Sequence, residues 1–268
     1  MKTVYTDKKT ITAKSIFTAV APFASIGILL VIWLSASNVN SELVPTPLMA
    51  FDRFLLLFTK PISNMTLFGH IWASLRRVFL ALLISFALGI PFGVMIGWNK
   101  TLNAIFGTLF ELIRPIPPIA WLPIVIMWFG IDELPKVIIV FIGTFMPVVI
   151  NSYTGIKMVQ SLHLDVARMF NANERQLLLE VAVPAAMPAI FAGVRNATSG
   201  GWMVVLAAEM IGAKAGMGFL ITRGMEFFDV PLIMVGMLVI GVIGAILAVI
   251  TDYIERWACP WNKKLELD

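Results

Sequence analysis

The sequence has few of the residues that metal, redox or covalent enzyme chemistry requires. Its 268 residues include one cysteine, Cys259, and two histidines, His70 and His163, which lie far apart. Neither an internal disulfide nor a cysteine-based metal site can therefore form within one chain. The motifs H-E-x-x-H, G-x-S-x-G and G-x-x-x-x-G-K-[ST] are also absent. These absences exclude a zinc-protease helix, a nucleophile elbow and an ATP-binding P-loop in this chain.

Charge is scarce as well. Only 13% of the residues are charged and 59% are hydrophobic, whereas a soluble domain carries about 25% charged residues. This composition excludes a disordered chain and nearly every soluble enzyme class, and it predicts an all-α polytopic membrane protein. The net charge of +4 is small and scattered through loops. It is better explained by loop orientation than by a nucleic-acid partner, and no nucleic acid is expected.

Apolar runs of about 20 residues predict six transmembrane helices. They cover residues 16–34, 78–98, 102–130, 137–156, 185–210 and 230–250. The third run is interrupted by Arg114-Pro115-Ile116-Pro117-Pro118, which does not fit a regular helix. We therefore expect a short helix up to Ile113, an irregular proline segment and a span that reaches Gly130.

The predicted domain organisation follows from these runs. It comprises an N-terminal tail (1–15), a first span (16–34), a core of five spans (71–252) with a cytoplasmic loop (157–184), and a C-terminal tail (253–268). A cleaved signal peptide is the alternative for the first run, because Ser35-Ala36-Ser37 resembles a small-residue cleavage site.

The distribution of lysine and arginine predicts the orientation. Six crossings place both termini on one side, and that side, with Arg114 included, holds twelve of these cations against seven on the other. The excess predicts cytoplasmic termini. Arg76 and Arg77 fit this topology poorly because they lie at the outer start of the second span, and Arg195 stays unassigned.

Small residues repeat at helical spacing in two spans. Gly89, Gly93 and Gly97 share one face of the second span, and Gly241 and Ala245 share one face of the sixth. Such stripes predict closely packed helices. The outer segment 35–75 contains Pro45, Pro47 and Pro61, from which we expect no compact structure there.

Ionisable residues within membrane depth are few. Glu111, Arg195 and Glu209 all lie near predicted interfaces, and no series of carboxylates crosses the spans. Coupling to a proton or sodium gradient within this chain is therefore not supported.

The loop between the fourth and fifth spans is polar yet amphipathic. Leu162, Val166, Met169 and Phe170 recur at helical spacing. Asn171 tolerates the left-handed conformation that ends a helix, and Glu174 lies three residues later, as in a capping box. This pattern predicts a helix, a tight turn and a second helix that ends before Pro184. A structured loop of this length suggests a docking element for another protein.

This loop resembles a family signature. Asp165-Val166-Ala167, three residues, Asn171, nine residues and Val181-Ala182-Val183-Pro184 match the spacing of E-A-A-x3-G-x9-I-x-L-P, with Asp, Val, Asn and two further Val as departures. That signature is typical of permease subunits of binding-protein-dependent ABC importers. Residues 114–130 are similar to the R-P-x-P-P-x-A-W-x-P-x4-W-F-G run of the nitrate, sulfonate and taurine branch. Residues 184–195, 201–210 and 260–261 resemble the same branch, with taurine and aliphatic-sulfonate permeases the most similar.

The resemblance implies a type I, methionine-importer-like permease fold in a bacterial inner membrane. It also implies a second copy of this chain, two ATPase subunits that bind ATP and Mg, and a periplasmic or lipid-anchored binding protein. The residues it assigns to ATPase coupling are Asp165, Val166, Ala167, Arg168, Met169, Phe170, Asn171, Glu174, Arg175 and Pro184. Those expected along the translocation path are Pro115, Pro117, Pro118, Trp121, Trp202 and Glu209, while Trp128, like the other tryptophans, fits a lipid interface equally well.

Several alternatives stay open at this point. Within the family, the solute is taurine or another sulfonate, or instead nitrate, bicarbonate, an aromatic carboxylate or a pyrimidine precursor. Outside the family, one alternative is an ion-coupled carrier, whose uptake an uncoupler would abolish and vanadate would leave unaffected. The other is an intramembrane enzyme, which would form product as the purified chain alone. The amphipathic loop could also lie on the lipid surface.

Overall fold

The computed structural model describes residues 13–261, and of residues 13–20 and 22 it describes the backbone alone. Within that range the chain is helical, with a single isolated β-bridge between Ile62 and Met65. The α-helices are α1 (Ala13–Val39), α2 (Pro47–Thr59), α3 (Leu67–Trp98), α4 (Lys100–Ile113), α5 (Leu122–Phe129), α6 (Glu133–Lys157), α7 (Ser161–Met169), α8 (Glu174–Gln176), α9 (Val183–Met210), α10 (Met217–Glu226) and α11 (Val230–Ala258). A 3₁₀ turn, η1 (Pro118–Trp121), precedes α5, and a π-helical segment, η2 (Leu177–Ala182), joins α8 to α9.

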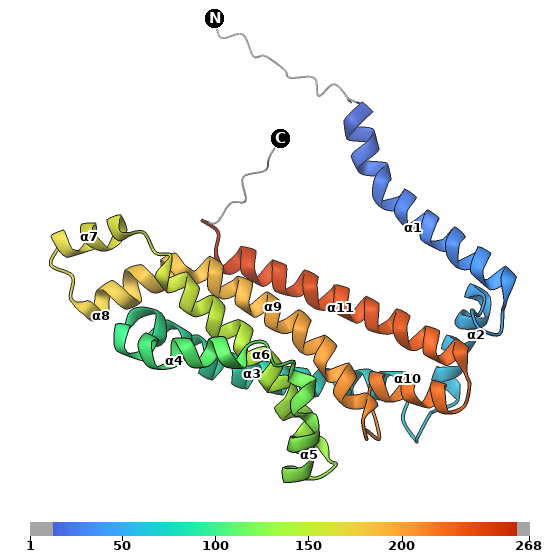
Figure 1. The fold of residues 1–268 in the computed structure, drawn as a ribbon. Coiled ribbons are helices and arrows are strands. Elements are labelled where there is room, and N and C mark those ends of the chain that lie inside the picture. The colour runs from blue at the N-terminus through green and yellow to red at the C-terminus, as the bar shows by residue number, and fades with distance from the viewer. Residues whose placement is uncertain (1–12, 262–268) are drawn as a thin grey trace, which may run out of the picture.

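Four helices are long and apolar enough to cross a membrane: Leu67–Trp98, Glu133–Lys157, Glu174–Met210 and Val230–Ala258. They form an elongated bundle (Figure 1). The pair Lys100–Ile113 and Pro118–Phe129 is bent by 88° and counts as a fifth span if it crosses as a unit. The proline break expected in the third run is confirmed. A count of six stays a prediction, since the side chains of residues 16–20 and 22 in the first run are not described.

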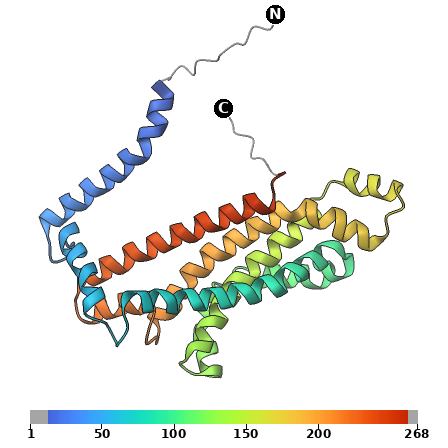
Figure 2. The same cartoon turned by 180° about the vertical axis from the view of Figure 1, so that it is seen from behind.

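Helix α1 stands apart from the bundle (Figure 2). Its apolar side chains are largely exposed, with Phe23 and Leu29 more than half accessible. Near its end the Trp33 indole Nε1 donates to the carbonyl oxygen of Pro45 at 2.9 Å, which ties α1 to the segment before α2.

The segment 35–75 is more ordered than expected. Thr46 accepts a hydrogen bond from the backbone N–H of Met49, and Pro47 occupies the first turn of α2. Proline is favoured there because that turn needs no N–H donor. The expectation of no compact structure was therefore wrong: Pro47 begins a helix instead of interrupting one.

Helices α3, α6 and α9 pack against one another at very short range. A Cβ on Gly93 would lie 2.5 Å from the carbonyl oxygen of Val149 and 2.7 Å from the Cβ of Ser152, so only glycine fits there. This confirms the predicted stripe in α3. The close packing predicted for the stripe in α11 is not found in this chain. Gly241 is exposed, and a Cβ added to it would meet no atom of the described residues within 4 Å.

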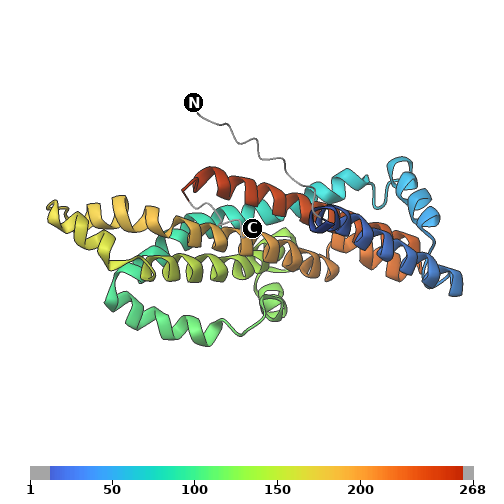
Figure 3. The same cartoon turned by 90° about the horizontal axis from the view of Figure 1, so that it is seen from above.

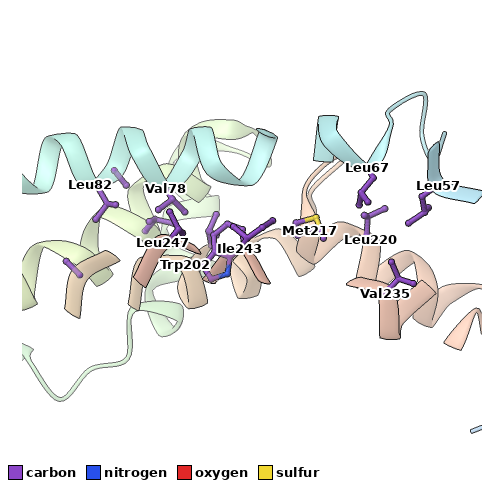
Figure 4. Packing of buried hydrophobic residues seen from close by; sticks show 14 of the residues in the cluster. Leu57, Leu67, Val78, Leu82, Trp202, Met217, Leu220, Val235, Ile243 and Leu247 are labelled. Carbon is purple, nitrogen blue, oxygen red and sulfur yellow. The ribbon is translucent and has the colours of Figure 1, made fainter. Parts of the chain in front are cut away.

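The main hydrophobic core is formed by residues of α2, α3, α6, α9, α10 and α11 (Figure 4). Trp202 lies within it beside Val78, Ile243 and Leu247, is only 4% exposed, and donates its indole N–H to the carbonyl oxygen of Ile240 at 3.2 Å. Burial of so large a side chain contributes about 3 kcal/mol by area. Trp202 is thus a packing residue in this structure, which corrects its expected place along the path.

Candidate coupling segment, buried ion cluster and translocation cavity

The segment from α7 to α8 projects beyond one end of the bundle, opposite α10 (Figure 1). Its turn is the one the sequence predicts. Asn171 has φ +57°, its N–H donates to the carbonyl oxygen of Arg168, and the next N–H, of Ala172, reaches back to Ala167. This pair of bonds is a Schellman motif, which ends a helix through one left-handed residue.

The second helix begins and continues differently from the prediction. Its capping box joins Asn173 and Gln176, not Asn171 and Glu174. The helix also does not end before Pro184. In the π-helical segment the N–H of Val183 bonds to the carbonyl oxygen of Leu178, five residues back. This wider turn brings Pro184 into the first turn of α9, where a missing N–H costs little. The α7–α8 segment is therefore continuous with a membrane span.

One face of α7 packs against the bundle and the other face is exposed. Leu164 of this helix and Leu178 of the π-helical segment pack against a second buried cluster, which consists of Val94, Ile156, Ala182, Ala186 and Ile190. The apolar side chains on the other face, Leu162, Val166, Met169 and Phe170, are 45–83% exposed. Asp165 and Arg168 pair at 3.0 Å beside them, and Ala167, Glu174 and Arg175 complete the exposed or half-exposed segment. Exposed apolar side chains gathered on one helix face are typical of an interaction surface.

At the opposite end of the bundle, a buried ion cluster joins four elements. The Arg77 guanidinium donates through Nη1 to Glu209 at 2.6 Å, and through Nε and Nη2 to Glu133 at 2.8 and 2.6 Å. It also donates to the carbonyl oxygen of Ala215. Arg77 and Glu209 are 1% exposed. The cluster thus ties α3, α6, α9 and the loop before α10 together.

Both carboxylate oxygens of Glu209 accept hydrogen bonds within this cluster. It accepts hydrogen bonds from the Ser74 hydroxyl at 2.8 Å and from the N–H of Gly218 at 2.9 Å, in the first turn of α10. A carboxylate at this position complements the helix dipole. Gly216, at φ +130°, passes over the carboxylate, where any Cβ would collide with it. The structure therefore corrects the expected place of Glu209 along the path.

His70 lies at the same end of the bundle and links two further segments by hydrogen bonds. Its Nδ1 accepts from the N–H of Gly216, and its Nε2 lies 3.1 Å from the carbonyl oxygen of Ile62. This pattern fits a neutral ring with the proton on Nε2. Sequence reasoning missed the cluster, although Arg77 and Glu209 were both noticed as charges near the same predicted membrane interface. A second long-range pair, between Arg195 and Glu255, joins α9 to α11.

The proline break borders a cavity of about 360 Å³ between the α4–α5 bend and the middle of α6 and α9. Its wall includes Pro118 and Trp121 from the predicted path, together with Arg114, Gly143, Met146, Asn151 and Asn196. Pro115 and Pro117 are exposed beside it. Trp128 is 70% exposed and does not line this cavity. Seen from above, α4 lies apart from the bundle and returns to it through the bend (Figure 3).

Comparison with known proteins identifies the scaffold that carries these features. Residues 89–264 match the family described as binding-protein-dependent transport system inner membrane component. The chain belongs to this family. It is 31% identical to the taurine transport system permease protein of Escherichia coli over 246 residues, with 90% of each chain covered. It is 32% identical over 244 residues to a bicarbonate transport system permease protein of Synechococcus elongatus, with 88% of each covered.

Solved structures agree on the fold. A chain of the methionine ABC transporter, crystallised in inward-facing conformations, superposes with a TM-score of 0.62 at 16% identity, over 77% of this chain and 98% of that one. The predicted type I importer fold is thus confirmed. The chain is a multi-pass ABC importer permease subunit, a transport component without catalytic activity of its own.

The buried cluster predicts a large difference between two adjacent arginines. Arg77→Gln leaves Glu209 buried without its counter-charge, which costs about 3–5 kcal/mol. Arg76→Gln removes a pair at 3.3 Å whose Arg76 side chain is 53% exposed, and is expected to cost less than about 1 kcal/mol. Thermal unfolding of the purified permease in detergent compares the two. Equal melting temperatures would contradict the structural role assigned to Arg77.

Proposed function

We propose that this permease forms the translocation path of an ATP-driven importer for a small organic anion, with taurine or another sulfonate as the first candidate. The observation that carries this proposal is the exposed apolar face of α7, held on a segment continuous with a membrane span. Similarity to a taurine permease and an aliphatic-sulfonate permease supports the solute class. Similarity of the same degree to a bicarbonate permease keeps bicarbonate, and with it nitrate, as the second candidate.

The proposed assembly has two copies of this chain, two ATPase subunits and one periplasmic or lipid-anchored binding protein. ATP and Mg bind to the ATPase subunits. The family description, which refers to binding-protein-dependent transport, supports a separate solute-binding partner and argues against an ion-coupled carrier. The exposed face of α7 favours a protein partner over the lipid surface. Two acidic residues, Asp165 and Glu174, balance two arginines, Arg168 and Arg175, so the segment lacks the basic excess that favours anionic lipid.

The proposed mechanism transmits closure of the ATPase dimer through this segment. Val166, Met169 and Phe170 seat in a groove of the ATPase, and Asp165, Arg168 and Arg175 orient the contact. Because the π-helical segment joins α8 directly to α9, movement of the segment moves a membrane span as a rigid lever. The neighbouring packing of α3, α6 and α9 carries that motion to the proline-lined cavity.

The coupling proposal predicts the effect of one charge in the apolar face. Phe170→Asp should weaken ATPase association roughly tenfold or more, since truncation of a buried aromatic anchor costs about 2 kcal/mol or more, and should abolish solute-stimulated ATP hydrolysis without blocking membrane insertion. Asp165→Lys should uncouple in the same way. Phe228→Asp is the matched control, because Phe228 is 89% exposed at the opposite end of the bundle. Normal uptake by the Phe170 and Asp165 variants would refute the coupling assignment.

The proposed orientation, with both termini and α7 in the cytoplasm, predicts opposite labelling of two exposed positions. Single cysteines at Ser63 and Lys157 should react with an impermeant thiol reagent from the periplasmic and cytoplasmic sides respectively. Cys259 is replaced by serine in both, although burial already raises the pKa of its thiol and slows its reaction. Labelling of both positions from the same side would overturn this topology.

A further inference from the structure

The bend after α4 places a cation beside the middle of α6 and α9. Arg114 continues the last turn of α4, since its N–H donates to the carbonyl oxygen of Phe110. It lines the 360 Å³ cavity with Gly143, Asn151 and Asn196, which lie within about two turns of the midpoints of α6 and α9. Arg114 thus lies closer to the middle of α6 and α9 than a position in a cytoplasmic loop implies.

Arg114 is exposed at the edge of the cavity, whereas Arg53, Arg77 and Arg195 are buried or half-buried in the bundle. Arg53, Arg77 and Arg195 each pair with a carboxylate of another helix or of the bundle ends. Among residues 13–261, no ion pair within 4.0 Å includes Arg114. Glu111 lines a smaller neighbouring cavity of about 170 Å³ with Arg114, without pairing with it. A cation at membrane depth is costly and is usually functional.

The surroundings of Arg114 suit an anionic group. Within the described part of the chain, the larger cavity has no carboxylate among its lining residues, whereas Asn151 and Asn196 bring side-chain amides and Trp121 an indole. The amide nitrogen of Asn151 donates to the carbonyl oxygen of Pro147 at 2.8 Å, which fixes the side chain against α6. A guanidinium presents several N–H donors in one plane and matches a sulfonate or carboxylate through two parallel bonds.

We propose that Arg114 is the residue of the translocation path that contacts the anionic group of the solute, with Asn151 and Asn196 beside it as uncharged hydrogen-bonding groups. This inference rests on the proposed function, because it requires the proline-lined cavity to be part of the path. One cation without a second charge at the cavity attracts an anion and still releases it, as conduction through a path requires. The site selects for negative charge, while the separate binding protein selects the solute.

The test measures the charge preference of the cavity with two thiol reagents. The assembled importer, in proteoliposomes and on a Cys259→Ser background, carries Ile150→Cys, a position that lines both cavities with Arg114. Sulfonatoethyl methanethiosulfonate is the anionic probe and its trimethylammonium analogue the cationic one. Arg114→Gln should lower the ratio of anionic to cationic reaction rates roughly tenfold, since one unit charge nearby is removed. Arg114→Lys should retain the ratio. Lys100→Gln, which removes an exposed cation at the start of the same helix, is the matched control and should leave it unchanged.

An unchanged ratio in Arg114→Gln would overturn the proposal, and so would a failure of Ile150→Cys to react with either reagent in every nucleotide state. Uptake of taurine, nitrate and bicarbonate by the same proteoliposomes tests the proposed function separately from the role of Arg114. A lowered ratio together with no ATP-dependent uptake of these solutes would support the anion site and refute the proposed solutes. Normal taurine uptake with an unchanged ratio would support the proposed function and refute the role of Arg114.

Discussion

The close approach of the α3, α6 and α9 backbones is the constraint on which the other features depend. Gly93 places α3 directly on the carbonyl oxygen of Val149 in α6, and a Cβ on Gly193 of α9 would lie 2.7 Å from the Cβ of Asn151 in the same helix. Helices in this contact cannot slide without collision, so they move together. Because α8 and the π-helical segment extend α9, this three-helix unit connects the exposed α7 segment to the cavity and to the far end of the bundle.

Charge is distributed along this unit in a consistent way. At the end that holds α10, Arg77 pairs with Glu209 and with Glu133, and further along Arg195 pairs with Glu255. Arg76 and Lys136 also lie within 4.0 Å of Glu133. These pairs hold helices together and engage the charges with one another. At the proline break the bundle instead keeps Arg114, which the described part of the chain leaves without a carboxylate partner. Paired charges thus fix the scaffold, and the unpaired cation is the one placed to act in transport.

Much of this was predictable from local patterns. The long spans follow from apolar runs, the break from three closely spaced prolines, and the end of α7 from an asparagine that tolerates positive φ. The signature around Asp165 indicated the family because its spacing reflects this helix–turn–helix geometry. Apolar periodicity also marked the face of α7 that remains exposed.

The remainder depends on contacts between distant segments, which local patterns do not contain. Arg77 and Glu209 are separated by 132 residues, and only the folded bundle shows that they neutralise each other. Trp202 is compatible with a core, a path or a lipid interface until its neighbours are known. Pro184 predicts a helix end by its chemistry, yet the π-helical turn before it removes the conflict. The level that Arg114 reaches beside α6 and α9 depends on the bend between α4 and α5, and this bend cannot be read from the order of residues in the chain.

The most direct test of the central claim is the mass of the complex extracted with mild detergent from its native membrane. The account predicts two copies of this permease with two ATPase subunits, and loss of the ATPase subunits when Phe170 is replaced by aspartate. A permease that is released alone under the gentlest extraction, or an ATPase that remains bound after that substitution, would contradict the assignment of α7 as the element through which ATP hydrolysis drives transport.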